Sequence, residues 1–158
     1  MRITIINRQN KVNLDLNLYK KISTYISEKF DKDKNTELNI VFVGKDEIKI
    51  LNKKYRNKGT PTDVLSFSYN KNNGAFIKDQ DLPVIGEIVI SPEVAIENIK
   101  ENKNKIEDSW NINHEIALLI IHGLLHIYDY DHEIKEDKIK LDRIQSSLLN
   151  DVKNLFSL

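Results

Sequence analysis

The chain of 158 residues contains no cysteine, which excludes a disulfide framework and every metal site built on thiolate ligands. A metal site in this protein must use imidazole, carboxylate or water. Neither sign of charge is in excess, because 24 basic residues balance 24 acidic ones. This balance excludes a strongly basic nucleic-acid-binding tail and a disordered polyelectrolyte, but it leaves a local basic cleft open.

Long hydrophobic runs are also missing. The segment "ITII" near the N-terminus is too short for a signal peptide, and "IALLII" (116–121) is too short to span a bilayer. We therefore expect a soluble, cytoplasmic protein without a membrane partner. The chain shows no internal repeat, no low-complexity linker and no sign of a second domain, so we expect one domain over residues 1–158.

The hydrophobic pattern predicts four strands and five helices. The strands are expected at 2–7, 37–44, 64–69 and 85–91. The helices are expected at about 15–31, from Asp46 onward, from Pro92 to about 104, at 111–128 and at 134–156. In the second helix, Asp46 is the predicted cap, and Ile48, Leu51 and Tyr55 the predicted buried face. This order predicts the α+β class, with a mixed four-stranded sheet packed against helices.

Three of the four histidines lie within "HGLLHIYDYDH" (122–132). His122 and His126 are four residues apart in an apolar segment, so they share one face of a buried helix with Cβ atoms about 5–6 Å apart. Two imidazoles in this arrangement can bind one ion at about 2.0–2.1 Å each. The residues after Tyr128 favour a turn, which would bring His132 back as a third ligand.

Three histidines without a fourth protein ligand leave a position for water, which is typical of catalytic zinc. Such a site lowers the pKa of the bound water to about 7. Nickel, cobalt or copper would also suit three imidazoles. The alternative is that the two helical histidines are hydrogen-bonded core residues. We interpret His114, two turns earlier, as a near-cap or surface residue.

A metalloprotease is one alternative function. A zinc-protease pattern places a third histidine six residues after HExxH, and the step from His126 to His132 is also six. However, Gly123 stands where that pattern needs its glutamate, so no adjacent general base is present for peptide attack. Next to His122, a glycine instead allows a backbone or a substrate to approach closely.

The segment "HGLLHIYDYDHE" resembles the H-G-x-L-H-x-x-G-Y-D-H signature of the YbeY family of bacterial single-strand endoribonucleases. The segment "LNKKYRNKGTPTDVLSF" (51–67) is similar to the family's L-N-x-x-Y-R-x-K-D-x-P-T-D-V-L-S-F, and "GEIVIS" (86–91) to its G-D-I-x-I-S. The three blocks keep the family's order. The resemblance implies a zincin-like metal-dependent hydrolase domain.

The resemblance also implies roles for individual residues. His122, His126 and His132 would bind one metal ion, Zn²⁺ first among the candidates, with His122 also counted as catalytic. Arg56 matches the family's active-site arginine, and a guanidinium suits a scissile phosphate and its developing charge. The alternative for Arg56 is a surface arginine at a helix end.

Other residues near these blocks have weaker assignments. Asp63 would either cap a turn or contact a metal ligand without binding the ion itself. Lys53, Lys54 and Lys58 would either track phosphates or be solvated charges. Asp129 replaces the family's glycine before Tyr130, and this substitution can alter the turn that brings His132 back.

The function implied is that of a single-strand-specific, metal-dependent endoribonuclease in 16S rRNA 3′-end maturation and ribosome quality control. Its partners would be single-stranded RNA, the 16S rRNA precursor, and the small ribosomal subunit or its assembly factors. The alternative from another class is a ribosome-assembly factor with a structural zinc and no significant nuclease activity. The sequence shows no aromatic stacking ladder and no RNA-binding signature, which disfavours a pure binder.

Overall fold

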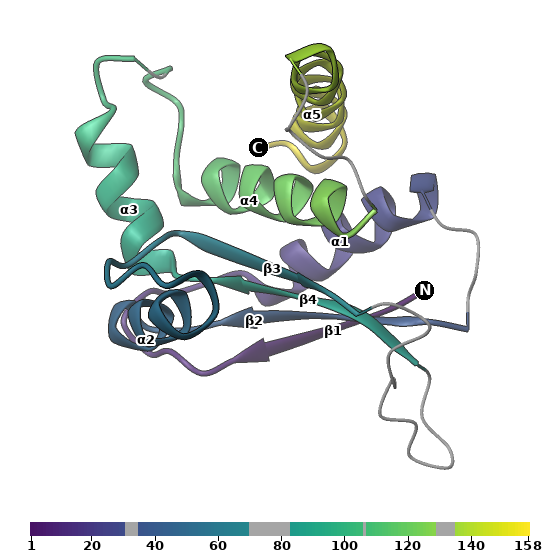
Figure 1. The fold of residues 1–158 in the computed structure, drawn as a ribbon. Helices are drawn as coiled ribbons and strands as arrows, with labels where there is room; N and C mark the ends of the chain where they lie inside the picture. The colour runs from purple at the N-terminus through teal and green to yellow at the C-terminus, as the bar shows by residue number, and fades with distance from the viewer. Residues whose placement is uncertain (31–34, 70–82, 106, 129–134) are drawn as a thin grey trace.

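The computed structural model describes residues 1–30, 35–69, 83–105, 107–128 and 135–158. In this part of the chain, four strands form one sheet and five helices pack around it (Figure 1). The strands are β1 (Arg2–Asn7), β2 (Glu37–Phe42), β3 (Val64–Ser68) and β4 (Val84–Ile90). The helices are α1 (Leu16–Phe30), α2 (Lys45–Arg56), α3 (Pro92–Glu101), α4 (Ile112–Ile127) and α5 (Lys135–Phe156).

The sheet has the strand order β1-β2-β4-β3. Strands β1, β2 and β4 run parallel to one another, and β3 pairs with β4 in the antiparallel direction. Side chains of β2 alternate between two apolar clusters, with Ile40 and Phe42 in one and Val41 in the other. Strands buried on both faces have such continuous apolar sequences. The predicted α+β class with a mixed four-stranded sheet is confirmed.

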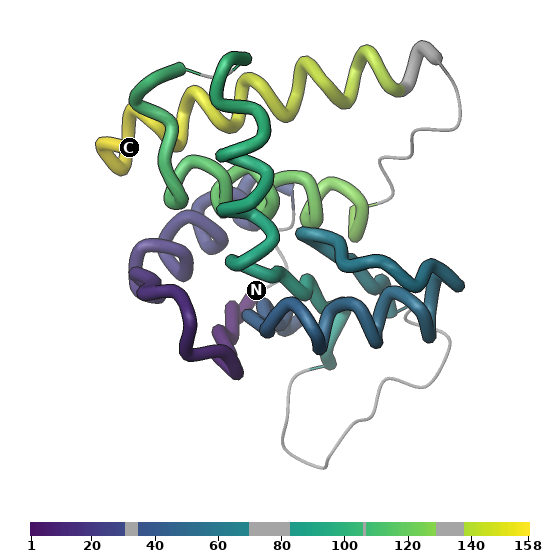
Figure 2. The backbone as a smooth tube through the Cα atoms, turned by 90° about the vertical axis from the view of Figure 1, so that its left-hand side faces the viewer, coloured from purple at the N-terminus to yellow at the C-terminus, as the bar shows by residue number. Residues whose placement is uncertain are grey.

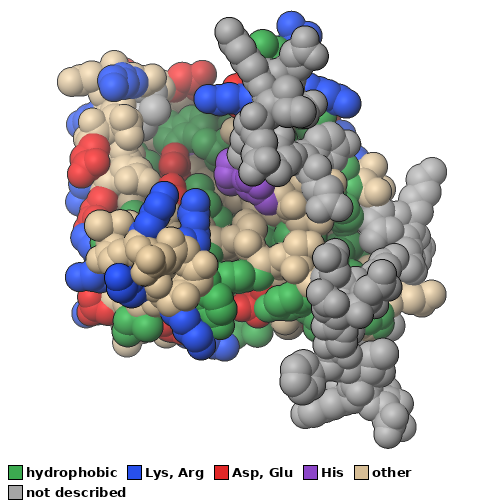
Figure 3. All heavy atoms as spheres, viewed as in Figure 1, with side chains coloured by type: hydrophobic (Ala, Val, Ile, Leu, Met, Phe, Trp, Pro, Cys, Tyr) green, Lys and Arg blue, Asp and Glu red, His purple; other side chains and the backbone are tan. Residues whose placement is uncertain are grey.

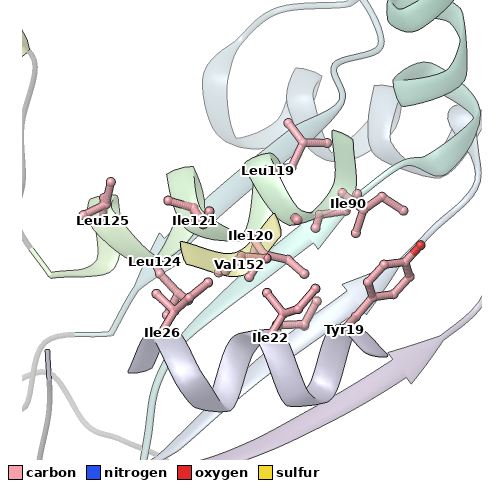
Figure 4. Close-up of a cluster of buried hydrophobic side chains, with 14 of the residues drawn as sticks. Tyr19, Ile22, Ile26, Ile90, Leu119, Ile120, Ile121, Leu124, Leu125 and Val152 are labelled. Atoms are coloured by element: carbon pink, nitrogen blue, oxygen red, sulfur yellow. The ribbon is translucent and has the colours of Figure 1, made fainter. Parts of the chain in front are cut away.

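The larger cluster lies between the sheet and the three helices α1, α4 and α5. Figure 4 shows side chains of α1 pointing toward α4 and Val152 of α5. The fully buried members include Tyr19, Ile22 and Ile26 of α1 and Ile120 and Leu124 of α4. In both Figure 1 and Figure 2, α4 lies between α5 and the sheet. Its position explains why α4 is apolar on almost every side.

The N-terminus of α4 is closed by a capping box. The side-chain oxygen of Asn111 accepts hydrogen bonds from the backbone N–H of Asn113 at 2.9 Å and of His114 at 3.4 Å. In return, Nδ1 of His114 accepts the backbone N–H of Asn111 at 3.3 Å. Three N–H groups that the helix itself leaves unpaired are thereby satisfied, which sets the start of the helix.

The smaller cluster lies on the opposite face of the sheet, where α2 packs through Ile48. Two predictions for α2 are wrong. The cap is Gly44 and not Asp46, because β2 runs straight into the helix, and a carboxylate oxygen of Glu93 accepts the backbone N–H of Lys45 at 3.1 Å. Tyr55 is 56% exposed, because α2 ends beside the edge strand β3, and the described sheet has no further strand to cover it.

No helix within these segments combines the length and the apolar character that a bilayer-spanning helix needs.

Candidate active site

The last turn of α4 brings two predicted ligands together. The Nε2 atoms of His122 and His126 are 3.0 Å apart, and the two ring centroids are separated by 4.5 Å. Both side chains are partly exposed, although the residues between them are buried. The predicted shared helix face is confirmed, and both Nε2 atoms point to one spot.

Glycine allows this turn of α4 to sit close to the sheet. A Cβ atom on Gly123 would lie 2.8 Å from Cγ2 and 2.9 Å from Cδ1 of Ile88 in β4. The close neighbour is therefore a core side chain. On the strand side, a Cβ on Gly86 would lie 3.0 Å from Cδ1 of Ile127, the residue after His126. The histidine pair is held against β4 by close packing at both glycines.

Gln145 of α5 contacts the back of His122. Its Oε1 lies 3.1 Å from Nδ1 of His122, and because a carboxamide oxygen only accepts, Nδ1 is the donor. Nε2 of His122 then carries the lone pair that a metal ion requires. Sequence analysis missed Gln145, which is 23 residues from its partner. The available signal was a polar residue beside the apolar stripe of the last helix, four residues after Leu141.

Arg56 is the last residue of α2, and hydrogen bonds fix the turn that follows it. Asn57 adopts the left-handed conformation with φ of 57°, and its backbone N–H donates to the carbonyl of Asn52. The buried side chain of Asn52 donates to the carbonyl of Thr60 at 2.7 Å. This turn leads the chain from α2 into β3 and leaves the Arg56 side chain at the edge of the sheet.

One cavity of about 710 Å³ joins these parts. It lies between the end of α2, strand β3 and the last turn of α4, and it is lined by His122, His126, Arg56, Tyr55, Asp63 and Ser66, among others. Figure 3 shows histidine side chains at the surface beside a group of Lys and Arg side chains. The structure thus brings Arg56 to the same cavity as His122 and His126.

The histidine pair fits a tetrahedral metal ion. Two ligands at about 2.0–2.1 Å from such an ion are about 3.3–3.4 Å apart. The observed Nε2 separation of 3.0 Å is close to this value, so a small movement would admit the ion. Within the described ranges, no group of three His, Cys, Asp or Glu side chains could hold a metal ion. The predicted third ligand, His132, and the substitution at Asp129 lie outside those ranges.

His114 belongs to the cap of α4. It is a buried residue with 2% of its surface exposed, stacked on Trp110 at 5.1 Å between ring centroids. Burial, and after it the charge of Lys153, holds the pKa of His114 below its usual value. The near-cap interpretation is confirmed, and the surface interpretation is wrong because Trp110 covers the ring.

Glu115 follows His114 and lies on the same side of α4 as His122, two turns away. Burial raises the pKa of its carboxyl group; a hydrogen bond from Nε1 of Trp110 at 2.7 Å opposes this, and the charge of Asp63 adds to it. Asp63 itself lines the cavity, and its Oδ2 accepts a hydrogen bond from Nδ2 of Asn98 at 3.0 Å. This bond holds β3 to α3, a role that the sequence did not predict.

The predicted lysines do not line the cavity. Lys53 and Lys54 line a second, shallow depression on the outer side of α2, together with Ile50 and Gly59. The exposed Lys58 lines neither this depression nor the cavity. Of the cations predicted to meet phosphate, Arg56 alone is among the described residues that line the cavity.

Comparison with known proteins extends the resemblance to nearly the whole chain. A family model described as endoribonuclease YbeY matches residues 4–153. Endoribonuclease YbeY of Syntrophomonas wolfei is 34% identical over 160 residues, covering 97% of this chain and 98% of the relative. That of Caldicellulosiruptor bescii is 37% identical over 151 residues, covering 90% and 91%.

A solved structure agrees with this result. The solution structure of TM1509 from Thermotoga maritima has a TM-score of 0.65 and 28% sequence identity, and the match covers 98% of this chain and 91% of that one. The family predicted from the three motif blocks is confirmed. This chain belongs to the endoribonuclease YbeY family.

Proposed function

We propose that this protein is a metal-dependent endoribonuclease that cleaves single-stranded RNA, with Zn²⁺ bound by His122, His126 and His132. The observation that carries this proposal is the pair of Nε2 atoms, 3.0 Å apart, in the same cavity as Arg56. The relatives are named endoribonucleases, which supports RNA as the substrate.

In this proposal, the residues in and behind the cavity have separate roles. His122 and His126 hold the ion, and Gln145 orients His122 so that its Nε2 faces the ion. When bound, the ion polarises a phosphate oxygen and lowers the pKa of a water molecule. The Arg56 guanidinium binds the scissile phosphate and stabilises the charge that develops on its oxygens.

For the cellular role, we propose 3′-end maturation of the 16S rRNA precursor and ribosome quality control in the cytoplasm, in contact with the small ribosomal subunit or its assembly factors. The family assignment supports this proposal. The test is cleavage of RNA that spans the 3′ end of the precursor. We expect a defined product at the mature end, whereas uniform degradation of this and an unrelated single strand would contradict the role.

The function itself is tested by metal content and RNA cleavage measured on the same samples. We expect the untagged protein to hold about one zinc per chain and to cleave a single-stranded but not a double-stranded oligoribonucleotide. His126→Ala should lose both the zinc and the cleavage. The matched control is His114→Gln, which keeps a capping-box residue at the helix start and should keep both.

Chelation separates the proposal from the alternatives. We expect a chelator to abolish cleavage while the circular dichroism of the protein stays unchanged, and added zinc to restore cleavage. Unfolding upon chelation, with no cleavage by the zinc-loaded protein, would instead indicate a structural zinc in an assembly factor. The relatives favour neither this alternative nor a metalloprotease.

A further inference from the structure

Tyr55 is an aromatic residue with an unusual position. It lies in the last turn of α2, lines the cavity that contains both histidines, and is 56% exposed. Its ring meets that of Phe67 in β3 edge to face, with centroids 5.0 Å apart and an interplanar angle of 67°. Phe67 lines the same cavity. Two rings from segments twelve residues apart in the sequence therefore form one aromatic wall.

A purely structural role explains this wall poorly. Phe67 packs at the margin of the smaller apolar cluster, and a ring placed only to close that cluster would bury most of its surface against it. More than half of Tyr55 instead remains in contact with solvent. Tyr69, one residue beyond β3, is 44% exposed, and its pKa is raised by burial, by Glu87 and by Tyr55, so it lies near this wall.

Positively charged side chains lie next to the two rings. Arg56 follows Tyr55 in the chain and lines the same cavity, and Nζ of Lys54 lies over the Tyr55 ring, 5.0 Å from its centroid. A nucleotide presents a flat apolar base joined to an anionic phosphate, which matches an exposed ring beside a guanidinium. The Lys54 side chain is exposed, so its ammonium group is able to move to a phosphate when a base covers the ring.

We propose that the Tyr55–Phe67 pair is a stacking subsite for one unpaired nucleobase next to the scissile phosphate. This inference rests on the proposed nuclease function and adds a reason for single-strand specificity. In a duplex, each base is stacked and paired inside the helix, so its flat face cannot reach an aromatic side chain on a protein surface. The subsite would therefore select unpaired RNA without reading its sequence.

The test combines base removal with ring removal. A set of single-stranded oligoribonucleotides carries one abasic residue at successive positions around the cleaved bond, and KM and kcat are measured with the zinc-loaded protein. For the wild-type protein we expect KM to rise about five- to a hundredfold at one position next to the cleaved bond, with a smaller change elsewhere. This measurement does not depend on the folding of any variant.

Tyr55→Leu should raise KM for the intact RNA by a similar factor and remove the penalty of the abasic residue at that position. Tyr55→Phe keeps the ring and should behave as the wild type. Ile50→Ala, which removes another exposed apolar side chain of α2 outside the cavity, is the matched control and should leave KM unchanged.

Two results would overturn the inference while the nuclease function stands: no position-dependent penalty in the wild-type protein, or an undiminished penalty in Tyr55→Leu. If the zinc-loaded wild-type protein cleaves no RNA, the proposed function fails, and the subsite fails with it.

Discussion

The helices α4 and α2 supply the two sides of the cavity in opposite ways. Ten residues of α4 are buried, and the helix lies between the sheet and α5. Only Ile48 and Asn52 of α2 are buried, and its last turn presents Arg56 and Tyr55 at the surface. Under the proposed function, the difference separates the groups that would hold the ion, which need rigid support, from those that would meet the substrate, which need access to solvent.

The comparison predicts that Arg56→Ala will remove activity without touching the metal site. Loss of a group that stabilises transition-state charge lowers kcat by about 10²- to 10³-fold. Zinc content and the urea midpoint should stay at the wild-type values, because Arg56 is exposed at the end of α2. The control is Arg143→Ala, an exposed arginine of α5 outside the cavity lining. Zinc loss in Arg56→Ala would break the division between the two helices.

Gln145→Leu should weaken the metal site itself. Without the carboxamide oxygen, the imidazole of His122 is no longer held with Nε2 toward the ion, and metal affinity should fall about 10- to 100-fold. Competition with a chromogenic chelator measures this change independently of activity. Gln145→Glu retains an acceptor and should restore the affinity. The exposed neighbour Ser146→Ala is the control, and equal affinities in all variants would contradict the role of Gln145.

Gly123→Ala should destabilise the fold where α4 meets the sheet. The new methyl group would contact Ile88 at about 2.8 Å, and overpacking of this kind lowers the free energy of unfolding by about 1–3 kcal/mol. Urea denaturation of the metal-free protein measures this change. In an Ile88→Ala background the penalty should shrink, because the three nearest atoms all belong to the Ile88 side chain. Additive penalties would show that the contact is not the cause.

The smallest expected effect is that of Glu115→Gln on the pH dependence of stability. The folded state raises the pKa of Glu115 above 4.5, so it binds the proton more tightly than the unfolded state does. The free energy of unfolding therefore decreases as the pH rises from 4.5 through the raised pKa. Glutamine still accepts the Trp110 hydrogen bond and does not ionise.

We therefore expect Glu115→Gln to match the wild type near pH 4 and to be more stable at pH 7, measured by urea denaturation of the metal-free protein. A variant that is less stable than the wild type at pH 7 would contradict the raised pKa. Asp151→Asn is the control, since its carboxyl group is exposed and its pKa is lowered, first of all by its hydrogen bond from Lys29.

Much of this fold follows from local pattern. The apolar run before His126 predicted a buried helix because only a helix with neighbours on all sides can bury such a sequence. The order of strands and helices predicted the mixed sheet. The pattern failed at Tyr55, because periodicity reveals which residues share a face but not where the sheet beneath that face ends. It also missed Gln145, because a polar residue beside an apolar stripe does not reveal its partner.

The sequence by itself determined the family, the α+β class, and the common helix face of His122 and His126, because motif order and helical spacing are local properties of the chain. Only the tertiary structure decided that Arg56 lines the same cavity as that pair, that Gln145 supports His122, and that Tyr55 and Phe67 form one exposed wall. These contacts join α2, β3, α4 and α5 across the sheet edge, and their geometry depends on how the elements pack, which no spacing along the chain records.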